Sequence, residues 1–294
     1  MESFYQHEGS LKWALLLLAF VIFALWETYH PRRVLVASTA RRWSSHALLS
    51  FLCNTLAAWV FRVSAVVVAA ASHHGLLNRQ TIPFAIRCII AVLLLDLLRY
   101  GQHYMYHAAS VLWRVHQVHH ADPDYDWSTS LRFHPGEVLL SQGIYLAAIV
   151  ILGPPAAAVF FLELADVTQN IFVHANVALP QWIDAPLRRL LITPDMHRIH
   201  HSAEESDQNS NFGTIFPWWD KLFGTYRQEA LAGDKMQVGL YEVGIKQGVS
   251  LLGMLTGPWT AYNSSRGEST YVQGYGSQEG NEEAQEKEAL GKTL

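Results

Sequence analysis

Long apolar runs separated by short polar stretches set the pattern of this chain. The runs cover Leu11–Trp26, Ala47–Ala71, Ile82–Leu98, Val138–Leu152 and Ala156–Val173. A helix needs about 20 mainly apolar residues to cross a bilayer, so each run is a candidate membrane-spanning helix. The helix-breaking sequence Gly153-Pro154-Pro155 separates the last two runs, which are expected to form a hairpin over residues 138–173. We therefore predict an all-α, polytopic membrane bundle.

The first run has a second interpretation as a cleaved signal peptide. Glu2 and Glu8 precede it where a signal peptide would carry basic residues, and no small-x-small cleavage site follows it. The sequence therefore favours a retained helix.

Basic residues between the first two runs predict the orientation of the bundle. Residues 31–46 contain Arg32, Arg33, Arg41 and Arg42 and no acidic residue. Short cytoplasmic loops are enriched in Lys and Arg, so this segment is expected in the cytoplasm. Counting crossings from there places the loop around His73 outside, and the chain after residue 98, apart from the hairpin, on the cytoplasmic side. We expect a multi-pass protein of a bacterial inner membrane, or of the endoplasmic reticulum in a eukaryote.

Changes in composition divide the chain into four expected parts. Residues 1–90 hold the N-terminal membrane helices, 91–230 a histidine-rich domain that includes the hairpin, 231–261 a candidate interfacial helix, and 262–294 a polar tail. The tail is rich in Gly, Ser, Gln and Glu and cannot bury enough apolar surface to offset the entropy of ordering it. We predict that the tail is disordered.

The overall composition excludes some classes of protein. Apolar residues make up 50% of the chain and charged residues 16%, well below the roughly 25% of soluble domains. The net charge is -4 and there is no Lys/Arg-rich block, which argues against binding to nucleic acid. The unusual number is 15 histidines.

Most of these histidines have the spacing that brings side chains to one face of a helix, where positions three or four apart lie together. The spaced groups are His103 and His107; His116, His119 and His120; His174; and His197, His200 and His201. Imidazole suits Zn, Fe, Cu and Ni, and nine imidazoles exceed the four ligands of one zinc. The sequence therefore predicts two metal ions. The histidines outside this region are expected to be surface or interfacial residues: His7, His30, His46, His73 and His74.

Other polar residues continue the histidine pattern. Asp96 and Tyr100 share a helix face with His103, and Asp166 and Asn170 precede His174 in steps of four. Ligating histidines usually donate their second N–H to a carboxylate or a carbonyl. The candidates for such support are Asp96, Asp166 and Asp195, with helix caps or interfacial charges as the alternative. For His134 the sequence leaves two roles open, one as a ligand or near the metals and one in the structure of a pocket or loop.

In their order along the chain, these motifs resemble those of the fatty acid hydroxylase and sterol desaturase superfamily. The sequences of the last motifs are most like those of bacterial members. The motifs are Asp96-x-x-x-Tyr100-x-x-His103-x-x-x-His107, Leu112-Trp113-Arg114-x-His116-x-x-His119-His120, Arg132-Phe133-His134-Pro135, Asn170-x-x-x-His174-Ala175-Asn176, Thr193-Pro194-x-x-His197-Arg198-x-His200-His201-Ser202, Asn211-Phe212-Gly213 and Trp219-Asp220-x-Leu222-Phe223-Gly224-Thr225. The resemblance covers roughly residues 90–227. Tyr104 and Ala121 depart from it, since the family often has Arg and Ser there.

The resemblance implies a non-haem di-metal centre in a helical cap on the cytoplasmic side of the membrane bundle. The metals would be two iron ions, with zinc able to replace them in purified protein. The implied ligands are His103, His107, His116, His119, His120, His174, His197, His200 and His201, with Asn170 as a water-mediated or weak tenth ligand. The implied supporting or pocket residues are Asp96, Tyr100, His134, Asp166 and Asp195.

The resemblance also implies an O2-dependent oxidoreductase that hydroxylates or desaturates a C–H bond of a lipid such as a sterol or fatty acyl chain. The chain has no Gly-rich dinucleotide motif and no cysteine cluster, so an external reductase, ferredoxin or cytochrome would supply electrons. The sequence does not separate hydroxylation from desaturation.

Three other functions compete with that of a lipid oxidoreductase. A zinc hydrolase would need a His-Glu-x-x-His string, which is absent. A metal transporter would need ligands at the bilayer midplane and an inverted repeat, and neither is evident. A catalytically silent metal-binding membrane protein of the same fold stays open as the alternative.

Overall fold

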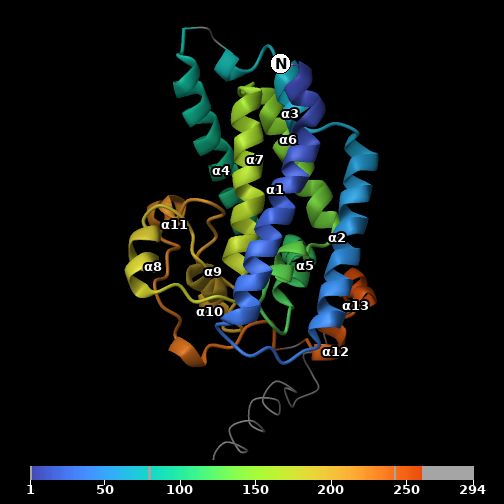
Figure 1. Ribbon diagram of the computed structural model, residues 1–294, viewed down its shortest axis with the longest axis vertical. Helices are drawn as coiled ribbons and strands as arrows, with labels where there is room; N and C mark the ends of the chain where they lie inside the picture. Colours follow the sequence, from blue (N-terminus) through green and yellow to red (C-terminus); the bar gives the residue numbers. More distant parts are fainter. Residues whose placement is uncertain (1, 79–80, 242, 260–294) are drawn as a thin grey trace, which may run out of the picture.

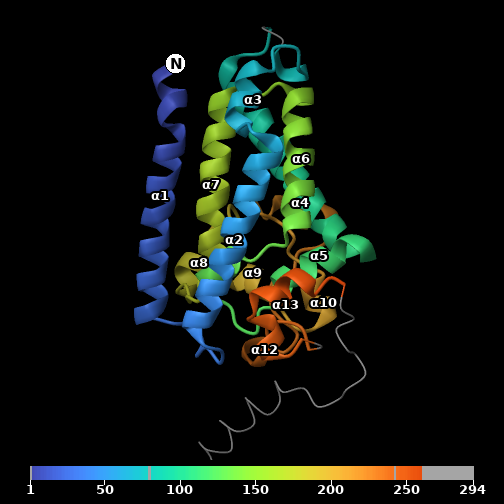
Figure 2. The same cartoon turned by 90° about the vertical axis from the view of Figure 1, so that its right-hand side faces the viewer.

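The computed structural model describes residues 2–78, 81–241 and 243–259, and the named elements of this part of the chain are all helical. An elongated bundle carries a group of shorter helices at one end, the lower end in Figures 1 and 2, which we call the short-helix end. The bundle helices are α1 (Glu2–Tyr29), α2 (Thr39–Phe61), α3 (Ala65–Ala71), α4 (Phe84–Ala108), α6 (Pro135–Leu152) and α7 (Ala156–His174). The predicted all-α fold is confirmed.

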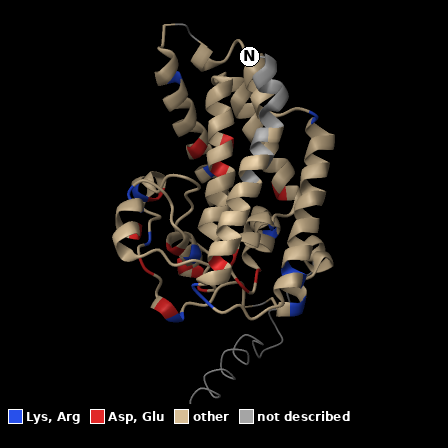
Figure 3. Ribbon diagram, in the orientation of Figure 1, with Lys and Arg blue, Asp and Glu red and all other residues tan. Residues whose placement is uncertain are grey.

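The shorter elements connect and cap the bundle. The shorter α-helices are α5 (Ser110–His120), α8 (Gln181–Leu187), α9 (Pro194–His200), α10 (Glu205–Gln208), α11 (Trp218–Phe223), α12 (Ile245–Gly248) and α13 (Leu251–Thr256). The 3-10 helices are η1 (Leu76–Asn78), η2 (Trp127–Leu131) and η3 (Gly233–Lys235). Charged residues concentrate at the short-helix end and are sparse along the bundle helices (Figure 3).

Three described segments are long and apolar enough to cross a membrane. They are Thr39–Asn78, which contains α2, α3 and η1, and the helices α6 and α7. The apolar part of α1 among the described residues, Leu17–Tyr29, is shorter. The chain is therefore a membrane protein, and both predicted hairpin helices are present. The predicted span at Ile82–Leu98 is not among the three, because Arg87, Asp96 and Arg99 interrupt the apolar residues of α4.

The predicted span Ala47–Ala71 is not one helix, because the chain turns at Arg62. The backbone of Arg62 has a φ of 56°, in the left-handed region, and ends α2. Ser64 then caps α3 by accepting a hydrogen bond from the backbone N–H of Val67 at 3.2 Å. This turn redirects α3 so that it packs against both α6 and α7.

The core of the bundle lies where α3, α4, α6 and α7 meet. Its fully buried side chains include Val66, Leu95, Ile149, Val159 and Phe160. Between membrane helices such contacts stabilise by van der Waals packing, since lipid is as apolar as these side chains. The core thus fixes the relative positions of α4 and α7, which carry histidines at their lower ends.

The turn between α6 and α7 needs glycine. Gly153 has a φ of 57°, which L side chains rarely adopt. Its backbone also lies so close to the backbone of Gly75 that a side chain on either glycine would collide with the other segment. This contact ties the loop after α3 to the predicted hairpin turn.

The segment expected to form one interfacial helix forms short helices instead. Within residues 231–259 the structure has η3, α12 and α13. Met254 of α13 packs with Leu49 and Cys53 of α2, so this segment is fastened to the bundle. Its location at the membrane interface stays a prediction. The predicted disordered tail, 262–294, lies outside the described residues.

Candidate metal centre

The nine histidines singled out by their spacing come together at the short-helix end in two groups. The five-histidine group consists of His103 and His107 of α4, His116 and His120 of α5, and His200 of α9. The four-histidine group consists of His119 of α5, His174 of α7, His197 of α9, and His201, which directly follows α9. Within each group the candidate ligand atoms all lie within 4.8 Å of one another.

The two His-x-x-His-His motifs each supply both groups. In α5, His116 and His120 are four residues apart and share a face, whereas His119 points to the other group. In α9 the same pattern sends His197 and His201 to the four-histidine group and His200 to the five-histidine group. The spacing therefore builds two adjacent groups from one motif.

Hydrogen bonds on the outer ring nitrogens fix the tautomers of two members of the five-histidine group, His103 and His200. The Nδ1 of His103 donates to the backbone carbonyl of Phe212 at 2.8 Å, and the Nδ1 of His200 donates to that of Ser210 at 2.7 Å. A carbonyl oxygen can only accept, so each Nδ1 carries the proton and each Nε2 carries a lone pair. The Nδ1 of His116 lies 2.7 Å from Oε1 of Glu137. Such outer partners are typical of metal-ligating histidines.

The inward nitrogens of this group are buried and have no partner among the described residues. They are the Nε2 atoms of His103, His107, His116, His120 and His200. An unsatisfied buried polar atom costs about 1–3 kcal/mol, and five in one place are unusual in a folded protein. The donor set fits a metal ion, which would engage all of these lone pairs at once.

In the four-histidine group, the inward nitrogens of three rings lie around the Nε2 of His174. The Nδ1 of His174 donates to the backbone carbonyl of Asn170 at 2.7 Å, and the Nδ1 of His119 to that of Arg132 at 3.2 Å. Both Nε2 atoms therefore carry lone pairs, yet they lie 3.2 Å apart. The Nε2 of His174 is also 3.2 Å from that of His201 and 3.1 Å from that of His197.

These Nε2 contacts are not a set of hydrogen bonds, because the one lone pair on His174 cannot accept from three rings at once, and the inward nitrogen of His119 also lacks a proton. Metal–nitrogen bonds of about 2.1 Å would place neighbouring ligand atoms roughly 3.0–3.4 Å apart. The spacing within the four-histidine group agrees with that range. The residues present therefore fit a metal ion here as well.

Burial keeps the histidines neutral. It lowers the pKa of His119, His120, His197, His200 and His201 well below the usual value, and neighbouring imidazoles lower it further. A neutral imidazole is the form that binds metal. At neutral pH these rings are therefore available as ligands.

A cavity of about 300 Å³ adjoins both groups and extends into the bundle between α4, α6 and α7. One part of its wall is formed by the histidine groups themselves. It includes His103 and His116 of the five-histidine group, and His119, His174 and His197 of the four-histidine group. Its other walls include Arg99, Tyr145 and Asp166. A molecule in this cavity, which we call the metal-centre cavity, would contact both groups. The candidate tenth ligand, Asn170, also lines this cavity, but its side-chain amide donates to the carbonyl of Ser130 at 3.1 Å.

Asp96 and Tyr100 hold α11 and the segments on either side of it rather than a histidine. Asp96 accepts hydrogen bonds from Nε1 of Trp219 at 2.7 Å and from the N–H of Ile215 at 3.3 Å. The hydroxyl of Tyr100 bonds that of Thr225 at 2.9 Å. The expectation that Asp96 accepts from a ligand is not met. It fastens the loop whose Phe212 carbonyl accepts from His103, so its support is indirect.

The other predicted supporting residues do not contact the histidine groups. Asp166 forms an ion pair with Arg99 at 3.1 Å, and Asp195 forms one with Arg198 at 3.0 Å. These two aspartates thus pair with arginines, a role different from both expectations, support of a ligand and a helix cap or interfacial charge. His134 caps α6, its Nδ1 accepting from the N–H of Gly136 at 3.0 Å, and lies outside both groups.

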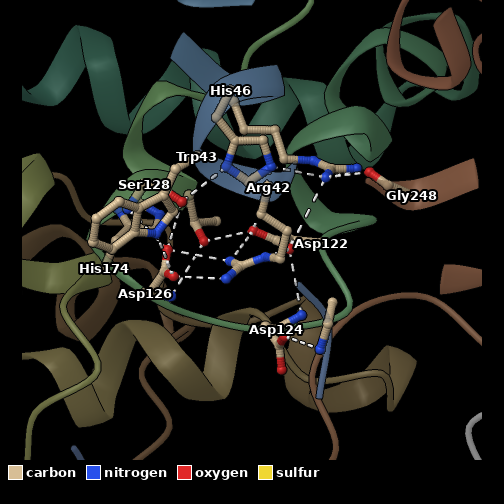
Figure 4. Close-up of polar contacts among 12 residues, drawn as sticks. Arg42, Trp43, His46, Asp122, Asp124, Asp126, Ser128, His174 and Gly248 are labelled. Carbon is tan, nitrogen blue, oxygen red and sulfur yellow. Dashed lines mark hydrogen bonds and ion pairs between the residues drawn. The ribbon is translucent and has the colours of Figure 1, made fainter. Parts of the chain in front are cut away.

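A buried polar network beside the four-histidine group was missed by sequence reasoning (Figure 4). Arg42 at the start of α2 is fully buried and forms ion pairs with Asp122 at 2.8 Å and Asp126 at 2.6 Å. His46 was expected at the surface but is also fully buried, between Ser128 and Arg132. Arg42 was counted as a loop charge in the orientation argument, and its charge is in fact neutralised by these aspartates.

This network holds the loop that supports the four-histidine group. Arg132 donates to the carbonyls of Val118 and Gly248, which joins α5 to α12. The carbonyl of Arg132 itself accepts from His119. The available signals were the alternating aspartates at 122, 124 and 126 and the arginine four residues before His46, but nothing local pairs them.

An apolar helical bundle with nine histidines converging beside a cavity defines a class of membrane metalloprotein. Residues 88–225 match the model of the fatty acid hydroxylase family. This match over just under half of the chain agrees with the resemblance that the histidine motifs carry.

Named relatives share this segment. Alkylglycerol monooxygenase of Homo sapiens is 30% identical over 141 residues, which are 48% of this chain and 30% of the relative. Ornithine lipid hydroxylase OlsE of Rhizobium tropici is 26% identical over 164 residues, which are 56% of this chain and 49% of the relative. The chain thus spans a third to a half of the length of the relatives it matches. No solved structure matches it.

Proposed function

We propose that this protein is a di-iron oxygenase that hydroxylates a C–H bond of a lipid. The observation that carries the proposal is the pair of histidine groups beside a shared cavity, in which hydrogen bonds to carbonyls turn the lone pairs of His103, His174 and His200 inward. The names of the relatives, a monooxygenase of alkylglycerols and a hydroxylase of ornithine lipids, favour hydroxylation over desaturation. Imidazole nitrogen is also a suitable donor for iron.

The reaction consumes C–H, O2, two electrons and two protons and yields C–OH and water. Iron in the two groups would supply the activation of O2, which side chains alone cannot perform. The protein residues keep the imidazoles neutral, orient them through Phe212, Ser210 and Asn170, and enclose the substrate beside them. The electrons come from an external donor, since the chain has no motif for a redox cofactor of its own.

The proposal predicts iron-dependent oxygen incorporation that depends on the histidines. Protein purified anaerobically should contain about two iron ions per chain. Cells that express it under ¹⁸O2 should accumulate a lipid with one ¹⁸O atom, seen by mass spectrometry of lipid extracts. Cells with His200→Ala should lack that lipid, because this ring faces the middle of the five-histidine group.

Two results would contradict the hydroxylase. One is fewer than one metal per chain in folded protein, and the other is the same labelled lipid in cells with His200→Ala. Two irons with no labelled lipid in any membrane tested would favour the catalytically silent alternative.

We further propose that the short-helix end faces the cytoplasm, where an electron donor has access. The support is the cluster of arginines in residues 31–46, although Arg42 is buried. On intact cells, a membrane-impermeant maleimide should label His73→Cys, in an exposed loop at the upper end. It should label Asp234→Cys, an exposed position at the other end, only after permeabilisation. The reverse pattern would invert the topology.

A further inference from the structure

A second space lies beside the metal-centre cavity, on the other side of α4. It is an apolar groove of about 880 Å³ between α4 and α6, which we call the alkyl groove. Its walls include Leu97, Met105, Leu112, Leu140 and Ile144. Met105 and Leu140 are also exposed on the outside of the bundle, with 49% and 42% of their surface accessible. The groove therefore opens on the outside of the bundle, beside the candidate membrane span α6.

A thin wall separates the groove from the cavity. Gln102 and Tyr106 of α4 line both spaces. Both reach across to Ser141 of α6, Gln102 by donating to its carbonyl at 3.2 Å and Tyr106 by bonding its hydroxyl at 2.9 Å. Gln102 is held by this one hydrogen bond, and Tyr106 by a second one as well, from its hydroxyl to the carbonyl of Glu137 at 3.2 Å. The wall therefore consists of two side chains, and rotation of both would join the two spaces.

The end of the cavity farthest from the histidines is closed to an alkyl chain. Arg99 and Asp166 form their ion pair there, and the guanidinium of Arg99 lies 4.6 Å from the ring centre of Tyr145. Asp166 precedes His174 by eight residues of α7, a rise of about 12 Å. Placing a hydrocarbon against charges inside a bundle is unfavourable. The apolar way out of the cavity is therefore sideways, through the wall into the groove.

The cavity itself suits an uncharged polar group. Beyond the histidine groups, its lining combines hydrogen-bonding side chains such as Ser141, Gln142 and Thr214 with the apolar Phe133, Val138 and Val173. Arg99 is the only Lys or Arg among its lining residues, and its charge is already paired with Asp166. A phosphate or carboxylate would find no free cation there, whereas hydroxyl, ether or amide groups would find both donors and acceptors.

We propose that the lipid substrate occupies both spaces, with an uncharged polar end in the metal-centre cavity and its alkyl chain in the alkyl groove. The oxidised C–H bond then lies within or next to the polar end of the lipid, and not in the middle of the chain. This placement rests on the proposed function, since it takes the cavity beside the histidine groups as the reaction site. It makes Gln102 and Tyr106 the residues between which the chain passes.

Photo-crosslinking tests where the chain lies. The probe is 1-O-hexadecylglycerol with a diazirine at the end of its alkyl chain, added to iron-loaded protein under argon without reductant. Mass spectrometry should find the label on residues 97–112 of α4 and α5 and on residues 140–144 of α6, which line the groove. Label found mainly on α3 or α7 would overturn the placement.

A filled groove provides a matched comparison. Ile144→Trp should lower labelling of the groove at least 10-fold and leave the iron content unchanged, because Ile144 lines the groove but not the cavity. Val150→Trp is the control, an exposed position on the same helix outside both spaces. Undiminished labelling in Ile144→Trp would contradict the proposal.

Competition tests the charge of the polar end. Unlabelled hexadecylglycerol should compete with the probe at a concentration at least 10-fold lower than hexadecyl phosphate. A better competition by the phosphate would overturn the choice of an uncharged group.

The position of oxidation separates this inference from the proposed function. Crosslinking needs no turnover, so groove labelling without any oxidised product would refute the hydroxylase and leave the lipid placement standing. A product hydroxylated in the middle of its chain would refute the placement and leave the hydroxylase standing.

Discussion

Replacing His174 with alanine is expected to remove the metal of the four-histidine group and to abolish lipid hydroxylation. The Nε2 of His174 is the atom from which the inward nitrogens of His119, His197 and His201 lie 3.1–3.2 Å away. Loss of a ligand should exceed the roughly 10–100-fold effect of losing an outer hydrogen-bond partner. We expect the iron content to fall from about two to about one per chain, measured by elemental analysis, and product formation to fall more than 100-fold.

His134→Ala is the matched control, since His134 is buried nearby but lies outside both groups. Its loss removes the cap of α6 and should cost about 1 kcal/mol of stability while both irons are retained. A drop in iron content with His134→Ala, or two irons with His174→Ala, would show that the ligand assignment is mistaken.

The second large effect is expected from Arg42→Leu. Arg42 pairs with the carboxylates of Asp122 and Asp126. Each of these side chains has at most 1% of its surface accessible to solvent. Burial by itself would raise the pKa of Asp122, but the guanidinium of Arg42 outweighs it and holds this pKa well below its usual value. Removing one partner of a buried ion pair costs about 3–5 kcal/mol, because the remaining charge stays buried.

That cost corresponds to a fall of roughly 6–20 °C in the midpoint of thermal unfolding. It can be followed in detergent by loss of the monodisperse size-exclusion peak. Arg42→Lys keeps the charge but loses the two-pronged contact, so it should fall between Arg42→Leu and the unaltered protein.

Arg41→Leu is the control for this prediction, because Arg41 is the adjacent arginine and is exposed. It should change the midpoint little, as expected of a surface substitution. Equal losses for Arg41→Leu and Arg42→Leu would mean that the buried ion pairs do not stabilise the fold.

Much of the candidate site could be predicted from the sequence, because the spacing of its histidines lies within single helices. A separation of three or four residues fixes a shared helix face whatever the rest of the fold does, so His103 with His107 and His116 with His120 could be paired from sequence. The apolar runs predicted the bundle for the same reason, since length and hydropathy are properties of one segment.

The supporting residues were not readable, because their partners are distant in sequence. Asp96 has the spacing of a ligand partner, yet it bonds Trp219, 123 residues away. Arg42 and Asp122 are 80 residues apart, and no local pattern shows that they meet in the interior. Glu137 directly precedes an apolar run, and no local pattern links it to His116, whose Nδ1 lies 2.7 Å from its carboxylate.

The sequence by itself determined a helical membrane bundle and which nine histidines could act together, because both follow from periodicity within single helices. Only the tertiary structure decided how those histidines divide into groups of five and four, since that depends on how α4, α5, α7 and α9 cross. It also decided that the metal-centre cavity and the alkyl groove share one wall, formed by side chains of α4. Such spaces arise from packing between helices, which no single segment encodes.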